Sequence, residues 1–168
     1  MTVPGAAARI RTATPEDLPA LPVLEAAADR ILEAEPGDQA LPAPALTTPV
    51  EPRFILVAGN PPVGFARVDE LGGQAHLEQL SVQPDFGGRG IGRSVVEAAI
   101  DAARSRGCLS MTLSTFADIP FNGPFYASCG FEEFAQPGQA LAALRVHEAQ
   151  LGLDDLGRRV VMRIRLRP

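Results

Sequence analysis

The chain has 168 residues, of which 46% are hydrophobic and 21% charged, and its net charge at pH 7 is −5. This length suits one domain with a real core, and the composition is ordinary for a globular protein. The acidic balance argues against a dedicated nucleic-acid-binding protein, and no apolar run approaches the roughly 20 residues of a membrane span. The N-terminus lacks a signal-peptide pattern. We therefore expect a single cytoplasmic domain over residues 1–168, with a flexible tail at 1–8, that binds neither nucleic acid nor membrane.

All 15 basic residues are arginines, and alanine, glycine and proline are abundant, which indicates the codon bias of a GC-rich, bacterial genome. The two cysteines, Cys108 and Cys129, are too few for a disulfide framework and lack the spacing of metal ligands. We expect both to be small buried side chains, and we expect no metal site.

A strand over 9–12 and a helix are the first predicted elements. Thr14–Pro15 is typical of a helix start, and leucines and alanines then recur at helical spacing. Pro19 and Pro22 fall inside this pattern, so we expect the helix to kink or restart there. The segment 35–52 contains five prolines and is predicted to be a loop, or a short helix between proline breaks.

The acidic residues of this first helix, such as Glu25 and Asp29, are interpreted as a solvated face. The alternative is an acidic rim that attracts cationic amines.

Three strands come next, over 53–58, 63–71 and 74–82, and the last two are joined by a Gly-Gly hairpin turn. A long amphipathic helix over 90–106 follows. In the strand at 108–115, alternation predicts that Leu109, Met111 and Leu113 lie on one buried face. The other predicted elements are a short helix at 125–129, a strand at 131–135, a helix at 141–151 and a strand at 159–166.

Three glycines, Gly88, Gly90 and Gly92, crowd the start of the long helix. Glycine backbone can approach a ligand closely, and the first N–H groups of a helix have no partner inside it. Together with the helix dipole, and with Arg89 and Arg93, this favours an anion. The pattern predicts a pyrophosphate cradle, or else a tight strand-to-helix turn without a ligand. It is neither a P-loop, which needs a lysine, nor a Rossmann turn, whose last glycine gap is one residue longer.

The same segment resembles the acetyl-CoA motif of the GNAT superfamily of N-acetyltransferases. That motif reads apolar-x-V-x-P and then [Q/R]-x-x-G-x-[G/A]. Here Val82 and Pro84 supply V-x-P, Gly90 and Gly92 supply G-x-G, and Gly87 stands at the Gln/Arg position.

A second segment, FNGPFYASCGF at 121–131, is similar to the family's Y-x-x-x-G-F element through Tyr126, Gly130 and Phe131. The longer phrase TLSTFADIPFNGPFY resembles a bacterial branch of the family that reads TLTTF-x-D-V-P-W-N-x-P-F-Y. The resemblance covers nearly the whole chain, from about 9 to 166.

The resemblance implies an α/β (α+β) single-domain GNAT fold, with a mixed, mostly antiparallel central sheet of six to seven strands flanked by helices on both faces. It also implies acetyl-CoA as co-substrate, held by loop N–H groups at its pyrophosphate and by strand backbone along its pantetheine arm. The implied coenzyme-binding residues are Leu80, Ser81, Val82, Gly87, Gly88, Arg89, Gly90, Ile91, Gly92, Arg93, Asn122 and Tyr126.

Acetyl transfer to an amine needs a base for the amine proton and a donor for the leaving thiolate. In the family the tyrosine equivalent to Tyr126 lies near the thioester sulfur, so Tyr126 is the expected catalytic acid. Glu78 is the expected base, or else a structural residue. Side chains of neighbouring strand residues face opposite ways, so only one of Glu78 and Gln79 should face the cleft. If it is Gln79, the base is a water or another acid. His76 is either a proton relay or a structural histidine.

We therefore expect an acyltransferase that moves an acetyl group from acetyl-CoA to a primary amine by direct attack, with a small-molecule amine favoured. A non-catalytic acyl-CoA sensor and a protein N-terminal acetyltransferase are the alternatives. In the family the region that corresponds to 35–52 shapes the acceptor pocket, so we expect this segment to influence acceptor specificity. The sequence names neither the acceptor nor the oligomeric state, and a homodimer stays open.

Overall fold

The computed structural model describes residues 8–33 and 53–167, which build a seven-stranded sheet in the order β1-β2-β3-β4-β5-β7-β6. Every neighbouring pair is antiparallel except β4 and β5. This mixed, mostly antiparallel sheet confirms the predicted fold class. The strands are β1 (Ile10–Thr12), β2 (Phe54–Ala58), β3 (Gly64–Leu71), β4 (Gln74–Val82), β5 (Ser110–Phe116), β6 (Glu132–Glu133) and β7 (Arg159–Arg165).

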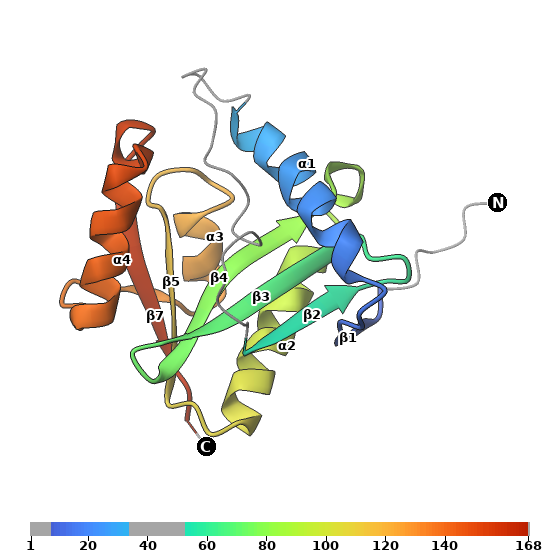
Figure 1. Cartoon of the computed structure of the whole chain (residues 1–168), viewed down its shortest axis with the longest axis horizontal. Helices are drawn as coiled ribbons and strands as arrows, with labels where there is room; N and C mark the ends of the chain where they lie inside the picture. The colour runs from blue at the N-terminus through green and yellow to red at the C-terminus, as the bar shows by residue number, and fades with distance from the viewer. Residues whose placement is uncertain (1–7, 34–52, 168) are drawn as a thin grey trace.

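Helices cover both faces of the sheet (Figure 1). They are α1 (Leu21–Glu33), α2 (Ile91–Ser105), α3 (Gly123–Ser128) and α4 (Gln139–Gln150). The alternation of β2 shows how the two layers form. Ile55 and Val57 pack with Leu21 and Leu24 of α1, whereas the side chains on the opposite face join the α2 cluster. That larger cluster also contains Tyr126 of α3, so α3 belongs to the α2 layer.

The α2 layer holds the main core because the apolar stripe of α2 lies directly on the sheet. Its buried positions recur at helical spacing: Ile91, Val95, Val96, Ala99, Ile100 and Ala103. The strand residues facing this stripe are apolar along β2, β3 and β4. On the opposite face the sheet is apolar only under the start of α1, and it becomes polar toward β4 and β5, where His76 and Thr112 are buried.

The first helix begins later than predicted. Asp17, not Thr14, organises the turn that precedes it. The Asp17 carboxylate accepts hydrogen bonds from the backbone N–H and hydroxyl of Thr14, and from the Arg11 guanidinium at 2.7 and 2.9 Å. A 3-10 turn at Leu18–Ala20 follows, and α1 starts at Leu21. Pro22 then falls in the first turn of the α-helix, where no N–H donor is needed, so the restart expected from the two prolines is what occurs.

Two smaller differences concern strand ends. Leu109 was expected on a buried face but is 69% exposed, because β5 begins at Ser110, two residues later than predicted, and leaves Leu109 outside the strand. The strand predicted at 131–135 is reduced to Glu132–Glu133. The predictions for 1–7 and 35–52 lie outside the described residues. Within the described part of the chain, no helix has the length and apolar character needed to cross a bilayer.

Candidate active site

The sheet opens where strands β4 and β5 diverge. The two parallel strands pair only at Ala75 with Met111 and at His76 with Thr112. Beyond His76, β4 keeps its pairing with β3, and β5 keeps its pairing with β7, so their facing edges have no strand partner among the described residues. Figure 1 shows the two strands diverging toward their C-terminal ends. A free strand edge can accept an extended ligand as an added strand, and Leu80–Val82 lie on this edge.

The glycine loop lies at the end of β4, directly before α2. Gly88 and Gly90 have left-handed φ angles of 72° and 78°, which glycine adopts without strain, and Gly90 is the N-cap of α2. A Cβ added to either glycine would meet no atom within 4 Å. The first helical hydrogen bond is donated by Ser94 N–H to the Gly90 carbonyl, so the N–H groups of Ile91–Arg93 have no intrahelical acceptor. The loop therefore presents unused donors to open space, as a phosphate site requires.

Both arginines predicted to bind the coenzyme lie at this entrance, and each already has contacts. The guanidinium of Arg89 stacks on Phe86 at 5.0 Å and reaches the Asp85 carbonyl at 3.4 Å. Arg93 donates to the Ser128 hydroxyl at 2.6 Å and to the Ser128 carbonyl at 3.2 Å. Arg93 thus ties α2 to the end of α3 next to the loop.

Asn122 lies just before α3, at the far side of the opening. The tight turn that holds it needs glycine at 123, because a Cβ there would be 2.5 Å from the Ala117 carbonyl oxygen. The Asn122 amide oxygen accepts a hydrogen bond from the Thr115 hydroxyl at 2.9 Å, while its buried Nδ2 has no partner among the described residues. Buried donors without partners are rare in folded proteins. This orphan N–H, with the open loop and the free edge of β4, fits a long ligand rich in carbonyl and phosphate oxygens, as coenzyme A is.

Tyr126 packs in the α2 layer, edge-on to Phe125 and Phe131 with ring centroids 5.2 and 5.9 Å away. Burial raises the pKa of Tyr126 well above its usual range, and the nearby Cys129 adds to the effect while Arg159 opposes it. At neutral pH the phenol is therefore protonated, as a proton donor must be, but it is a weaker acid than a free tyrosine.

Glu78 occupies a β-bulge. In the β3–β4 ladder Arg67 pairs with Gln79 and the next residue of β3, Val68, pairs with Leu77, so Glu78 is left without a partner. The strict alternation assumed from the sequence is therefore wrong at this point. Gln79 lies opposite Arg67 and donates to the Ser81 hydroxyl at 2.9 Å. Glu78 approaches His76, whose side chain lies on the α1 side of the sheet. Glu78 and Gln79 therefore both face the α1 side.

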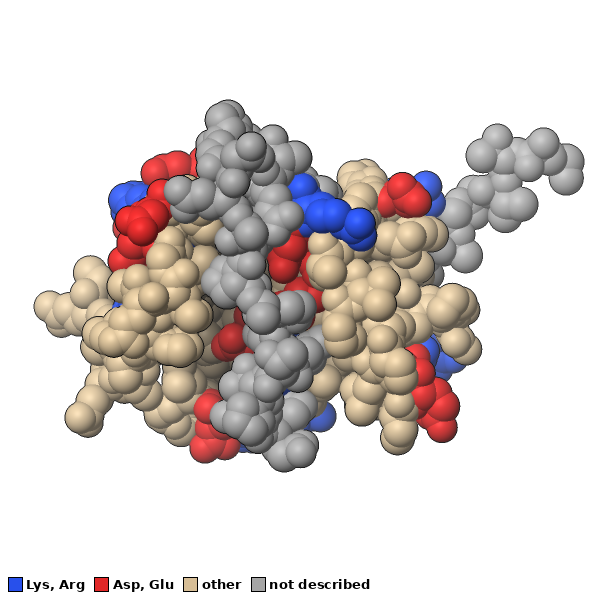
Figure 2. All heavy atoms as spheres, turned by 45° about the horizontal axis from the view of Figure 1, so that its top comes forward, with Lys and Arg blue, Asp and Glu red and all other residues tan. Residues whose placement is uncertain are grey.

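The environment of Glu78 is acidic, and its side chain is partly buried, with 28% of its surface exposed. Burial raises the pKa of Glu78, and the carboxylates of Asp69, Glu148 and Glu25 raise it further, while Arg67 opposes them. A carboxylate whose pKa is raised toward neutrality is a better proton acceptor for an amine than an ordinary surface glutamate. Figure 2 shows acidic side chains along the middle of one face.

His76 connects Glu78 to β5. Its Nδ1 lies 2.9 Å from the Thr112 hydroxyl, and its Nε2 lies 3.7 Å from the Glu78 carboxylate, too far for a direct hydrogen bond. Burial lowers the pKa of His76 to about 4, so the imidazole is neutral at pH 7. A neutral ring can pass a proton between Glu78 and a bridging water, or simply hold the strands together.

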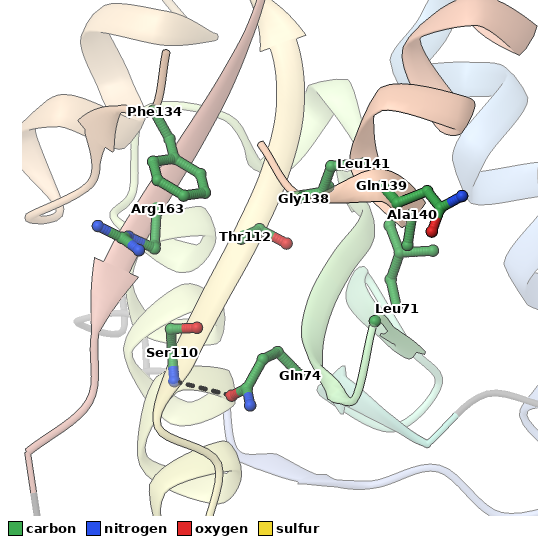
Figure 3. A pocket seen from close by; sticks show the side chains of 11 residues that line it. Leu71, Gln74, Ser110, Thr112, Phe134, Gly138, Gln139, Ala140, Leu141 and Arg163 are labelled. Carbon is green, nitrogen blue, oxygen red and sulfur yellow. Dashed lines mark hydrogen bonds between the residues drawn. The ribbon is translucent and has the colours of Figure 1, made fainter. Parts of the chain in front are cut away.

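A cavity of about 420 Å³ lies on the same side of the sheet as His76, at the end of β4 opposite the glycine loop (Figure 3). Thr112, which bonds His76, forms part of its wall, and Gln74 is fixed beside it by accepting the backbone N–H of Ser110 at 3.2 Å. The remaining lining residues are Leu71, Gly72, Phe134, Gly138, Gln139, Ala140, Leu141 and Arg163.

Several residues of the site were not identified from the sequence. Glu25 was interpreted as part of a solvated face, but it is only 3% exposed. Arg67, Asp69 and Glu148 carried no signal, because each becomes significant only through contacts between distant segments. Across residues 8–33 and 53–167, no group of three or more His, Cys, Asp or Glu side chains is placed to hold a metal ion.

The chain is similar in sequence to known N-acetyltransferases. Over 66 residues the chain is 33% identical to glucosamine 6-phosphate N-acetyltransferase 1 of Oryza sativa, and over 78 residues it is 33% identical to a [ribosomal protein bS18]-alanine N-acetyltransferase of Salmonella typhimurium. These matches cover 39% and 46% of this chain, and 38% and 53% of the relatives, so the chain spans about half or less of their length.

Among solved structures, the PaiA N-acetyltransferase of Thermoplasma acidophilum in complex with coenzyme A superposes with a TM-score of 0.67 at 15% identity, over 95% of this chain and 99% of that one. This likeness concerns the fold. Residues 22–131 match the sequence model of the acetyltransferase (GNAT) family. Since that match spans more than half of the sequence, the chain belongs to the GNAT acetyltransferase family.

Proposed function

We propose that this chain transfers the acetyl group of acetyl-CoA to a primary amine, by direct attack of the amine on the thioester. The observation that carries the proposal is the parting of β4 and β5 beyond His76. It leaves a candidate proton donor, Tyr126, in the α2 layer and a candidate base, Glu78, on the opposite face. Direct transfer is served by such an arrangement, because the amine that adds to the thioester carbonyl must lose a proton while the thiolate expelled from the tetrahedral intermediate must gain one.

In this proposal the coenzyme follows the open edge of β4. Its pyrophosphate lies on the N–H groups from Gly88 to Gly92, and its pantetheine arm pairs with the backbone of Leu80–Val82. The orphan Nδ2 of Asn122 supplies a donor on the other side of the opening. The thioester then lies where the two strands diverge.

The reaction moves one acetyl group and three protons, two from the amine nitrogen and one to the leaving sulfur. Glu78 accepts a proton from the ammonium, directly or through water, and the neutral nitrogen attacks the thioester carbon. The negative charge that develops on the carbonyl oxygen needs a donor, and the bulge frees backbone at Glu78 from the β3 ladder for this purpose. As the C–S bond breaks, Tyr126 donates its proton to the thiolate. Glu78, having passed the first proton to solvent, accepts the second proton of the amine nitrogen, which leaves a neutral amide, and both side chains are then reset by exchange with solvent.

The acceptor side suits a small cationic amine. The carboxylates of Glu25, Asp69 and Glu148 act on the same region as Glu78, so they attract an ammonium group. The cavity beside Thr112 has room for the rest of a small molecule. One relative is named for a small amino sugar phosphate and another for an alanine of a ribosomal protein, so a peptide acceptor is the second candidate.

The test is an amine screen with acetyl-CoA, following release of free coenzyme A and identifying the acetylated product by mass spectrometry. We expect at least one small primary amine to be acetylated, and Glu78→Gln to lose most of the rate at neutral pH. Acetylation of N-terminal peptides alone would favour the second candidate. Tight binding of acetyl-CoA without transfer to any amine or peptide would refute the proposal and favour a non-catalytic sensor.

A further inference from the structure

A buried ion pair joins α4 to β7 beside the candidate active site. Glu148 of α4 is 6% exposed and forms a hydrogen-bonded ion pair with Arg159, the first residue of β7. The Glu148 carboxylate also accepts the Ser114 hydroxyl at 2.7 Å and Arg145 at 3.3 Å, and Arg145 in turn pairs with Asp154 at 2.7 Å. The pair is therefore held rigidly, with its charges fixed in place.

Stability alone is a poor reason for such a pair. Taking two charges out of water costs about as much as their attraction returns, and well-packed apolar residues of the same size often serve as well. The guanidinium of Arg159 is moreover stacked on Phe116 at 4.6 Å, and its Nε is buried without a hydrogen-bond partner among the described residues. A role for the charges themselves is then the more economical explanation.

The negative end of the pair is linked to the candidate base by a chain of side-chain contacts. Ser114, which bonds Glu148, is two residues from Thr112 on the same face of β5. The Thr112 hydroxyl is hydrogen-bonded to His76, and His76 approaches Glu78. The negative charge of Glu148 therefore acts on Glu78 and His76, whereas the positive charge of Arg159 acts on Tyr126.

The two ends act in the directions that acetyl transfer needs. Glu148 raises the pKa of Glu78, together with Asp69 and Glu25 and against Arg67, so Glu78 holds an amine proton more firmly. Arg159 lowers the pKa of Tyr126, against the larger effects of burial and Cys129, so the phenol gives up its proton more readily. One rigid dipole thus serves both proton transfers.

We propose that Glu148 and Arg159 form a positioning pair, which touches no substrate and assists acetyl transfer through the field it exerts on Glu78 and Tyr126. The proposal rests on the proposed function for its catalytic meaning. The electrostatic effect of the pair on Glu78 can be tested without any substrate.

The substrate-free test is titration of the Glu78 carboxyl group by carbon NMR, in the wild-type protein and in Glu148→Gln. Removal of a neighbouring negative charge should weaken proton binding at Glu78 by about threefold or more. Asp154→Asn is the matched control. It removes a carboxylate from the same network, but one that is bonded only to Arg145 at the exposed end, so it should leave the Glu78 titration unchanged.

Glu148→Gln leaves Arg159 buried without its partner and so endangers folding. The double variant Glu148→Met, Arg159→Met removes both charges, keeps the volume and should fold. It should also weaken proton binding at Glu78, though less than Glu148→Gln does, because the opposing charge of Arg159 is removed as well. An unchanged Glu78 titration in either folded variant would overturn the proposal. If neither variant folds, the pair is structural and the proposal is equally overturned.

Once an acceptor amine is known, the pH profile of kcat/KM supplies a readout that a merely structural role would not move. In Glu148→Gln the acid limb of the kcat/KM profile should shift to lower pH. In a protein that already carries Glu78→Gln, adding Glu148→Gln should leave the pH profile unchanged. A loss of rate at every pH without movement of the limb would contradict the proposal. Failure of the proposed function looks different, because no amine is then acetylated even though Glu78 still responds to Glu148 in the NMR titration.

Discussion

The two ends of α2 offer a matched test of the phosphate cradle. Gly90 begins the helix with a φ of 78°, and Gly107 follows its end with a φ of 80°; a Cβ at either position meets no atom within 4 Å. Alanine in the left-handed region costs about 1 kcal/mol of unfolding free energy at each position. We therefore expect Gly90→Ala and Gly107→Ala to lower the melting temperature equally, by about 2–4 °C.

Coenzyme binding should separate the two variants. Only Gly90 lies among the N–H groups assigned to the pyrophosphate, where each charge-assisted hydrogen bond contributes about 1.5–3 kcal/mol. A methyl group that displaces even one of them should weaken coenzyme A binding about tenfold or more in Gly90→Ala. Gly107→Ala should bind like the wild type. Calorimetry with coenzyme A measures the affinity, and equal affinities in the two variants would refute the placement of the phosphates.

Further predictions concern the arginine, the acid and the base. Arg93→Ala should weaken coenzyme A more than Ser128→Ala does, because the second variant removes only the bond between the two side chains; equal losses would assign Arg93 a structural role. Tyr126→Phe should lower turnover on the order of 10²-fold with little change in coenzyme affinity, and wild-type turnover would exclude Tyr126 as the acid. The folded-state pKa of Tyr126 is raised above the unfolded value of about 10, so its contribution to stability is complete below pH 10 and is lost as the pH rises above it. Since Tyr126 is the only tyrosine and the chain has no tryptophan, tyrosinate absorbance reports it alone and should appear only with unfolding; ionisation near pH 10 in a folded protein would contradict its burial. Glu78→Gln should lose activity at neutral pH and regain much of it at high pH, where the amine is already neutral, and a wild-type pH profile would place the base elsewhere.

Much of the fold follows from local patterns. The strands β2, β3 and β4 and the helix α2 lie within a residue or two of their predicted bounds, because apolar periodicity and glycine turns mark them directly. The glycine loop is equally local: the left-handed φ of Gly88 and Gly90 is what a strand-to-helix turn with exposed N–H groups requires. These parts position the coenzyme side of the proposed site.

The base side depends on contacts that the sequence does not display. One extra residue in β4 turns both Glu78 and Gln79 toward the same face, and nothing in the pattern HLEQLSV marks the bulge. Glu25 becomes part of a buried cluster only when α1 folds over the sheet, and Glu148 only when α4 reaches β5. The late start of α1 has a similar cause, since Arg11 and Asp17 must first meet through side chains.

A crystal structure with acetyl-CoA bound tests the central claim most directly. We predict that the pyrophosphate lies on the N–H groups from Gly88 to Gly92 and that the pantetheine arm lies along Leu80–Val82. The thioester should lie between the diverging strands, with its sulfur within hydrogen-bond reach of the Tyr126 hydroxyl. Acetyl-CoA bound anywhere else, or with its thioester remote from both Tyr126 and Glu78, would contradict the account.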